Sequence, residues 1–145
     1  MEINLLKSSK NATTPDRKTV YSAGFDLYAS EDCVIDPGER KLVNTNIQLS
    51  IPPGYYGKIE SRSSLALSII DVSAGVIDSD YRGDIKVLLV NNRKFDYLQD
   101  NRLYIKTGMR IAQLIFLKHE TPIFKEVSVL DETVRGDRGF GSTGK

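Results

Sequence analysis

The segment IQLSIPPGYYGKIE (residues 47–60) carries the clearest structural signal in this sequence. Its first five residues alternate apolar and polar side chains, which is the period of a strand with one buried face. The Pro-Pro-Gly triplet at 52–54 has the composition of a tight turn, and a second strand is expected over Tyr55–Glu60. The segment therefore predicts two strands joined by a short turn.

Similar short apolar runs, separated by glycine and proline, lie on both sides of this segment. The run IKVLLVNN (85–92) has apolar side chains on both faces, so we expect it to be buried on both sides. Only Ser63–Ser68 suits a helical turn, with Ser63 or Ser64 as its cap. The further predicted strands are Phe25–Ala29, Arg40–Asn44, Val72–Val76, Leu103–Ile105, Ile111–Leu117 and Phe124–Val127. Many short strands and little helix predict an all-β domain, either a sandwich or a jelly roll.

The overall composition limits the classes of function. With 145 residues, 40% of them hydrophobic and 27% charged, the chain reads as one globular domain. A net charge of +1 provides no basic field for nucleic acid. The single cysteine, Cys33, excludes an intrachain disulfide, and the single histidine, His119, is expected to have a local partner. The first residues lack the apolar region of a signal peptide, and no apolar run reaches the ~18 residues that a membrane span needs. We therefore expect an intracellular protein, in the cytoplasm or the nucleus.

The glycine-rich tail Arg135–Lys145 (RGDRGFGSTGK) is the most distinctive local feature. Its last seven residues match the start of a phosphate-binding P-loop, but no helix can follow them, so the P-loop interpretation fails. Glycine amides together with Ser142 and Thr143 can still bind an anion, and Phe140 offers a face for a base. We expect a mobile lid over a nucleoside phosphate.

Two internal segments add chemistry. Arg62 followed by two serines combines charge with hydroxyl donors, which suits phosphate, although helix capping alone explains such a triplet. In GVIDSDYRG (75–83), Asp78 follows a short apolar strand and is placed to activate a water molecule or to contact Mg²⁺. Tyr81 offers its ring to a sugar. For Asp80 and Gly83, turn formation is the better explanation.

Together these segments resemble the signature motifs of the trimeric dUTP pyrophosphatases, the dUTPases. The matching motifs are Ala23–Leu27 (AGFDL), Ser61–Ala66 (SRSSLA), Gly75–Gly83, Gly108–Ile115 (GMRIAQLI) and Arg135–Gly144. The resemblance implies a jelly-roll-like distorted β-barrel formed by residues 1–134, with residues 135–145 as its lid. It also implies a homotrimer whose active sites lie at subunit interfaces, each built from the hairpin of one subunit, the phosphate contacts of a second and the lid of the third.

The implied activity is hydrolysis of dUTP to dUMP and pyrophosphate, by attack of water on the α-phosphate of Mg–dUTP. This reaction keeps uracil out of DNA and supplies dUMP for thymidylate synthesis. Asp78 would be the general base, Tyr81 would pack on deoxyribose, and Asp26 would contact the Mg²⁺ through water, with the metal held mainly by phosphates. The other implied substrate contacts are Arg62, Ser63, Ser64 and Gln113 at the phosphates, Gly75 and Ile77 at uracil, Arg135 at the γ-phosphate, Phe140 over uracil, and Gly141, Ser142 and Thr143 in the lid.

The sequence departs from the family pattern at a few positions. Ser61 replaces a proline before the arginine, and we expect a looser turn there. Ser73 stands in place of a glycine. Met109 replaces an aspartate of the fourth motif, which predicts lower local stability. The loop Arg93–Asn101 is longer than usual; we expect it to be peripheral, and a role in binding a partner stays open.

Two rival functions remain to be weighed. A dCTP deaminase shares the fold, but its chemistry needs a carboxylate on the strand after the third motif, and Ile85–Asn92 carries none. A non-catalytic structural or regulatory jelly roll would make Asp78, Arg62 and the tail incidental. Hydrolysis of dUTP is expected of a dUTPase and of neither rival, so an assay of dUTP turnover distinguishes them. Whether a cell or a virus encodes the chain, and hence whether a host cell contains it, stays open.

Overall fold

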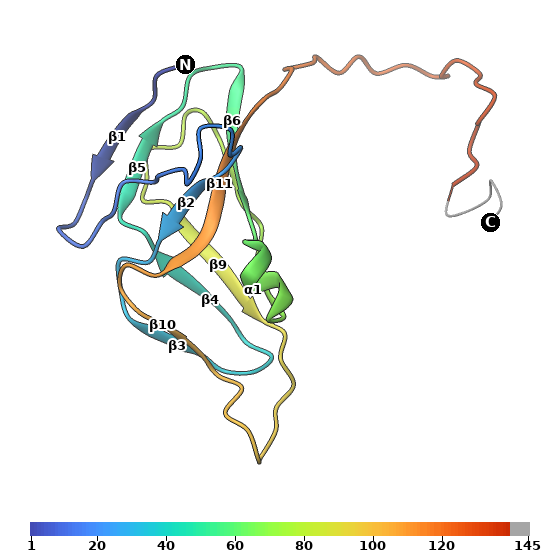
Figure 1. Ribbon diagram of the computed structural model, residues 1–145. Coiled ribbons are helices and arrows are strands. Elements are labelled where there is room, and N and C mark those ends of the chain that lie inside the picture. The colour runs from blue at the N-terminus through green and yellow to red at the C-terminus, as the bar shows by residue number, and fades with distance from the viewer. Residues whose placement is uncertain (140–145) are drawn as a thin grey trace.

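The computed structural model describes residues 1–139 and consists mainly of short strands (Figure 1). The elements are β1 (Asn4–Lys7), β2 (Phe25–Tyr28), β3 (Cys33–Ile35), β4 (Arg40–Asn44), β5 (Ile47–Ser50), β6 (Tyr55–Glu60), α1 (Ser63–Leu67), β7 (Ile70–Ser73), β8 (Val76–Ile77), β9 (Lys86–Asn91), β10 (Leu103–Ile105) and β11 (Arg110–Lys118). The predicted all-β class is confirmed. In the described residues, no helix is long and apolar enough to cross a membrane.

The strands form antiparallel sheets that join distant parts of the chain. One sheet has the order β2-β11-β6-β8 and another β4-β9-β7, with the two-stranded ribbons β1-β5 and β10-β3 beside them. Because β2 pairs with β11 and β4 with β9, early and late segments alternate in space, as in a jelly roll. This topology places β2, β11 and the end of β6 side by side (Figure 1).

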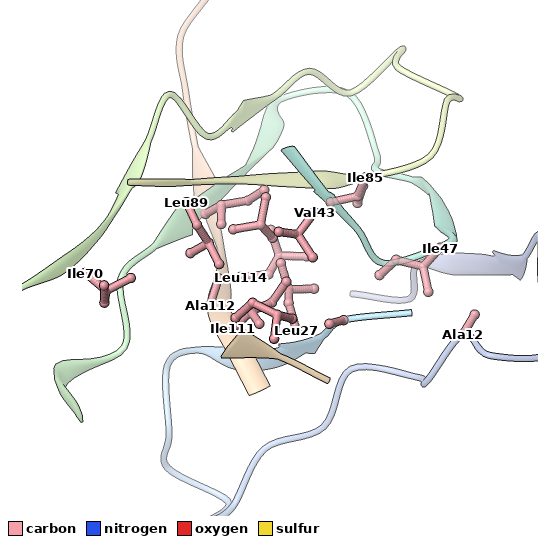
Figure 2. Packing of buried hydrophobic residues seen from close by; sticks show 14 of the residues in the cluster. Ala12, Leu27, Val43, Ile47, Ile70, Ile85, Leu89, Ile111, Ala112 and Leu114 are labelled. Atoms are coloured by element: carbon pink, nitrogen blue, oxygen red, sulfur yellow. The ribbon is translucent and has the colours of Figure 1, made fainter. Parts of the chain in front are cut away.

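The core lies between these two sheets. Figure 2 shows Val43 and Leu89, from the β4-β9 side, directed toward Leu27, Ile111 and Leu114 of β2 and β11. Each of these side chains is at most 1% exposed. Full burial of a side chain of this size contributes about 1.5–3 kcal/mol, so this layer holds the strands of both sheets in a fixed relation.

The strand predictions were confirmed where alternation and turns agreed. Predicted and observed bounds coincide for β4, β6 and β10. The predicted strand Phe124–Val127 is wrong: this segment is not a strand, and Phe124 is 95% exposed. The predicted strand Val72–Val76 is divided into β7 and β8, since Ala74 has a φ of 62° and Gly75 a φ of 116°.

The helical turn α1 was predicted, but its cap was not. Arg62 is the N-cap, with φ −80° and ψ 138°, and no side chain caps the helix. Ser63 and Ser64 instead lie in the first turn and are exposed. Their hydroxyls are therefore not engaged in capping.

After β11 the chain leaves the sheets as an arm, residues 119–139, which Figure 1 shows running away from the strands. At its start, the His119 amide donates to the carbonyl of Gly54 (3.1 Å), and the ring contacts Tyr56 edge-on. Farther along, Ile123 and Phe124 are each 95% exposed.

Candidate functional site

A hollow of about 340 Å³ lies where β2, β11 and the start of α1 meet. We call it the Arg62 hollow. Its lining residues are Lys18, Ser22, Ala23, Gly24, Asp26, Arg62, Ser63 and Gln113. The first, second and fourth motifs, which are far apart in the sequence, therefore meet in one place. Of the residues predicted at the phosphates, Arg62, Ser63 and Gln113 line this hollow, whereas Ser64 and Arg135 do not.

Asp26 is the electrostatic centre of the Arg62 hollow. Its Oδ1 accepts a hydrogen bond from Nε of Arg62 at 2.9 Å, and its Oδ2 accepts one from a terminal nitrogen of Arg110 at 3.2 Å. The side chain of Asp26 is only 13% exposed and that of Arg62 is 22% exposed. One carboxylate thus lies between two guanidinium groups, and this trio carries a net positive charge that suits an anion.

Gln113 is fixed beside this ion pair. Its Nε2 donates to the carbonyl of Ser61 at 3.0 Å. A Cβ on Gly24 would collide with Oε1 of Gln113, so only glycine leaves room for the amide. The hydroxyl of Ser61 also accepts the amide N–H of Val72 at 2.8 Å. Ser61 therefore fastens the turn before Arg62 to β7, contrary to the expected loosening.

The turn before β11 is bound by a carboxylate from the segment between β2 and β3. Asp32 accepts hydrogen bonds from Nζ of Lys106 (2.8 Å) and from the amide (2.8 Å) and hydroxyl (3.0 Å) of Thr107. These bonds lower the pKa of Asp32 to about 2. Met109 packs its side chain against the core instead. The turn before β11 is thus held by Asp32 and by the packing of Met109, and neither contact could be read from the sequence pattern.

A second hollow, of about 300 Å³, surrounds the hairpin that carries Asp78. We call it the Asp78 hollow. Its lining residues are Leu42, Val76, Ile77, Asp78, Tyr81, Asp84 and Lys86. Asp78 directly follows β8, as predicted, and is exposed. The hydroxyl of Tyr81 donates to the carbonyl of Asp84 (3.1 Å), which fixes the ring at the rim, 44% exposed.

The hairpin depends on a glycine at its base. The carbonyl of Gly75 accepts the amide of Ile59 at 2.8 Å, and β8 pairs with β6 at the edge of the sheet. A Cβ on Gly75 would lie 2.7 Å from the carbonyl oxygen of Ile59. The outer edge of β8 has no strand partner in residues 1–139, so its backbone groups face outward.

Replacing Gly75 by alanine should therefore destabilise the protein by more than the cost of placing alanine at a left-handed φ. The matched control is Gly38→Ala, since Gly38 has a φ of 81° but nothing within 4 Å of its virtual Cβ. We expect about 1 kcal/mol for Gly38→Ala and about 2–4 kcal/mol for Gly75→Ala, measured by urea unfolding. Equal losses in the two variants would show that the backbone contact with Ile59 is unimportant.

The two hollows share no lining residue. One chain therefore brings Asp26, Arg62 and Gln113 together, but does not bring them into a common cavity with Asp78. Arg135 lies in the arm, where its Nε donates to the carbonyl of Arg138 at 3.1 Å. The remaining predicted lid residues, Phe140, Gly141, Ser142 and Thr143, lie outside the described residues.

Sequence reasoning missed several residues that line the two hollows, and also Arg110, which lies next to one of them. Lys18 and Ser22 lie in an irregular segment before β2 that carries no periodic signal. Leu42 lies on β4 and reaches the Asp78 hollow only through the pairing of β4 with β9. Arg110 stands inside the fourth motif, which was the one signal that could have identified it.

The loop Arg93–Asn101 lies between β9 and β10 (Figure 1). A larger hollow, of about 600 Å³, lies at this loop. Asp100 stabilises this loop by accepting hydrogen bonds from Nε of Arg102 (2.8 Å) and the hydroxyl of Tyr104 (2.7 Å). None of its lining residues belongs to either of the other hollows. The loop is thus peripheral to the motif residues, as expected.

Comparison with known proteins identifies the family of this chain. The dUTPase family model matches residues 10–144. The deoxyuridine 5'-triphosphate nucleotidohydrolase of variola virus is 48% identical over 142 residues, which cover 98% of this chain and 92% of that protein. The vaccinia virus (strain Copenhagen) protein of the same name is 46% identical with the same coverage.

Solved structures give the same result. A mutant dUTPase of Staphylococcus bacteriophage 80alpha with dUpNHpp superimposes with a TM-score of 0.92 at 30% identity, covering 99% of both chains. A mutant dUTPase of phage phi11, described with a structural Mg(II) ion, has a TM-score of 0.85 at 25% identity and covers 91% of this chain and 100% of that one. Since the family model and the viral relatives each span nearly the whole sequence, this chain belongs to the dUTPase family.

Proposed function

We propose that this chain hydrolyses dUTP to dUMP and pyrophosphate, with Asp78 as the general base. The single observation that carries the proposal is that the chain has two hollows of complementary chemistry. The Arg62 hollow offers guanidinium, hydroxyl and amide donors, and the Asp78 hollow offers a carboxylate, a tyrosine ring and a free strand edge. Phosphoryl transfer needs this combination of positioned donors and an oriented water molecule.

The nucleoside end lies at the Asp78 hollow. Uracil pairs with the backbone of Gly75 to Asp78, because the outer edge of β8 presents N–H and C=O groups that uracil can match. The ring of Tyr81, held by Asp84, packs on deoxyribose and excludes a 2′-hydroxyl. Exclusion by direct contact discriminates strongly between close analogues, whereas a loose apolar pocket does not.

The phosphate end lies at the Arg62 hollow. Nε of Arg62 is engaged by Asp26, so its two terminal nitrogens are directed to the phosphates. Ser63, Ser64 and the amide of Gln113 supply further donors. Asp78 takes a proton from the attacking water, and the donors of the Arg62 hollow stabilise the negative charge that develops on the phosphates. Arg135 at the γ-phosphate and Phe140 to Thr143 as a closing lid complete the proposed site.

The donor set fits a metal ion that arrives with the substrate. Residues 1–139 contain no group of three or more potential ligands among His, Cys, Asp and Glu. Mg²⁺ commonly keeps its water molecules and binds through substrate phosphates with one or two carboxylates. Asp26 suits a contact through water, since each of its oxygens retains a second acceptor direction beside its arginine partner. The ion, when bound, neutralises phosphate charge.

The resemblance to the trimeric dUTP pyrophosphatases supports a homotrimer, and the separation of the two hollows in one chain agrees with sites shared between subunits. The exposed apolar side chains of the arm provide the means of association. In this proposal residues 1–134 form the β domain and residues 135–145 the lid. The viral relatives support a place of action inside an infected host cell, in the cytoplasm or the nucleus.

The protein with Mg²⁺ is expected to release pyrophosphate from dUTP, and to act on dTTP and UTP at least about 100-fold more slowly in kcat/KM. Parallel pyrophosphate assays on the three nucleotides test this prediction. Equal rates with dUTP and UTP would remove the role of Tyr81 against deoxyribose. Ammonia release from dCTP would indicate a deaminase, and no turnover of any nucleotide would indicate a non-catalytic subunit.

A further inference from the structure

Arg110 has an unusual place next to the Arg62 hollow. It is the first residue of β11, and a terminal nitrogen of its guanidinium lies 3.2 Å from Oδ2 of Asp26. Arg110 does not line the hollow, whereas Asp26 and Arg62 both do. Its guanidinium therefore reaches the site through the carboxylate of Asp26.

The carboxylate between the two arginines is held rigidly. The amide of Asp26 donates to the carbonyl of Asp16 at 2.8 Å, and Asp26 pairs with Gln113 in the β2-β11 ladder. Asp16 is itself engaged, by the hydroxyl of Tyr28 and by Nζ of Lys18. The backbone of Asp26 is thus fixed on both sides, and the remaining freedom is rotation of its carboxylate.

Arg110 controls that freedom. The bond to Arg110 restrains the rotation of the Asp26 carboxylate, and in the orientation that it holds Arg62 binds Oδ1 through Nε alone. Without Arg110 the carboxylate could rotate to present both oxygens to Arg62, and arginine and carboxylate prefer a two-bond, fork-like pairing. Such a pairing would turn a terminal nitrogen of Arg62 away from the hollow.

We propose that Arg110 is a positioning residue of the phosphate site, which occupies one oxygen of Asp26 so that the terminal nitrogens of Arg62 stay free for phosphate. The inference rests on the proposed function, in which Arg62 binds the substrate phosphates. In this proposal Asp26 orients Arg62, in addition to any contact that it makes with a metal ion.

The first test is the affinity for dUpNHpp, a dUTP analogue, measured by titration calorimetry. Arg110→Gln removes the charge and is expected to weaken binding about tenfold, the loss of roughly one charge-assisted hydrogen bond. KM for dUTP should rise by about the same factor with kcat nearly unchanged, because the contact aids binding rather than a group in the reaction. Arg110→Lys retains a donor for Oδ2 and should restore most of the affinity.

Arg40→Gln is the matched control, since Arg40 also begins a strand, is exposed and lines neither hollow. It should leave the affinity unchanged. Thermal unfolding of each variant separates a loss of folding from a loss of binding. Unchanged affinity in a folded Arg110→Gln protein would overturn the inference.

A double-mutant cycle distinguishes positioning from direct contact. In an Arg62→Ala background, Arg110→Gln should weaken dUpNHpp binding no further, because the residue that it positions is gone. Equal losses in both backgrounds would show that Arg110 acts on the ligand independently, and would also overturn the inference.

The same cycle with pyrophosphate as the ligand involves no nucleoside. Coupling between Arg62 and Arg110 in pyrophosphate binding, in a protein that does not hydrolyse dUTP, would retain the positioning role while the proposed function fails. Hydrolysis of dUTP without such coupling in either cycle would support the proposed function and overturn the positioning role of Arg110.

Discussion

Replacement of Asp78 by asparagine is expected to lower dUTP turnover roughly 100- to 10,000-fold, the usual contribution of a positioned general base. Asparagine has nearly the same size as aspartate and retains a carbonyl oxygen, but its amide cannot accept the proton of the attacking water. The exposed position of Asp78 after β8, at the rim of its hollow, makes a folding defect in this variant small. Steady-state pyrophosphate release measures the effect.

The affinity for dUpNHpp should stay within a few-fold of the unmodified protein, because Asp78 acts in the reaction rather than in binding. Asp80→Asn is the control: it removes an exposed carboxylate from the same hairpin at a position that does not line the hollow. Full activity in Asp78→Asn would exclude the general-base role. An equal loss in Asp80→Asn would show that the charge of the hairpin matters, and not one carboxylate.

The second large effect concerns the arm. Ile123→Asp combined with Phe124→Asp is expected to convert the proposed trimer to a 16.2 kDa monomer and to abolish dUTP turnover. Each of these side chains is 95% exposed in one chain, and covering such a residue typically gains about 1.5–3 kcal/mol. A carboxylate at a covered position would remain unpaired, at a cost that opposes association. Light scattering gives the mass, and the pyrophosphate assay gives the activity.

Tyr97→Asp combined with Leu98→Asp provides the matched control. Both residues are more than 90% exposed, at 94% and 93%, and the double change adds the same charge at the peripheral loop. This variant should remain trimeric and active. A fully active monomer of the arm variant would show that one chain forms a complete site, and an arm variant that stays trimeric would place the subunit contacts elsewhere.

The fold was predictable from sequence where a local pattern coincided with a local turn. β4, β6 and β10 have alternating or apolar side chains and clear boundaries, so their bounds were predicted correctly. β1 was missed because three of its four residues are exposed and its partner, β5, lies far along the chain. The predicted strand Phe124–Val127 does not form, because this segment has no strand partner within residues 1–139.

The site was predictable only in part. Arg62, Gln113 and Asp26 were selected by motifs, and their meeting in one hollow depends on the order β2-β11-β6, which no local pattern contains. The contact between Arg110 and Asp26 joins residues 84 positions apart. The cap of α1 was mispredicted because Arg62, whose side chain binds Asp26, is the N-cap, and no serine hydroxyl caps the helix.

The separateness of the Arg62 and Asp78 hollows has a genetic consequence if the sites are shared between subunits. A lesion in one hollow and a lesion in the other, carried on different copies of the gene, would then be distributed over different sites of a mixed oligomer. Some of those sites would combine two undamaged halves. Two alleles that are each inactive alone would partly complement each other in one cell, and a single chain defective in both hollows would impair the sites of its neighbours as well.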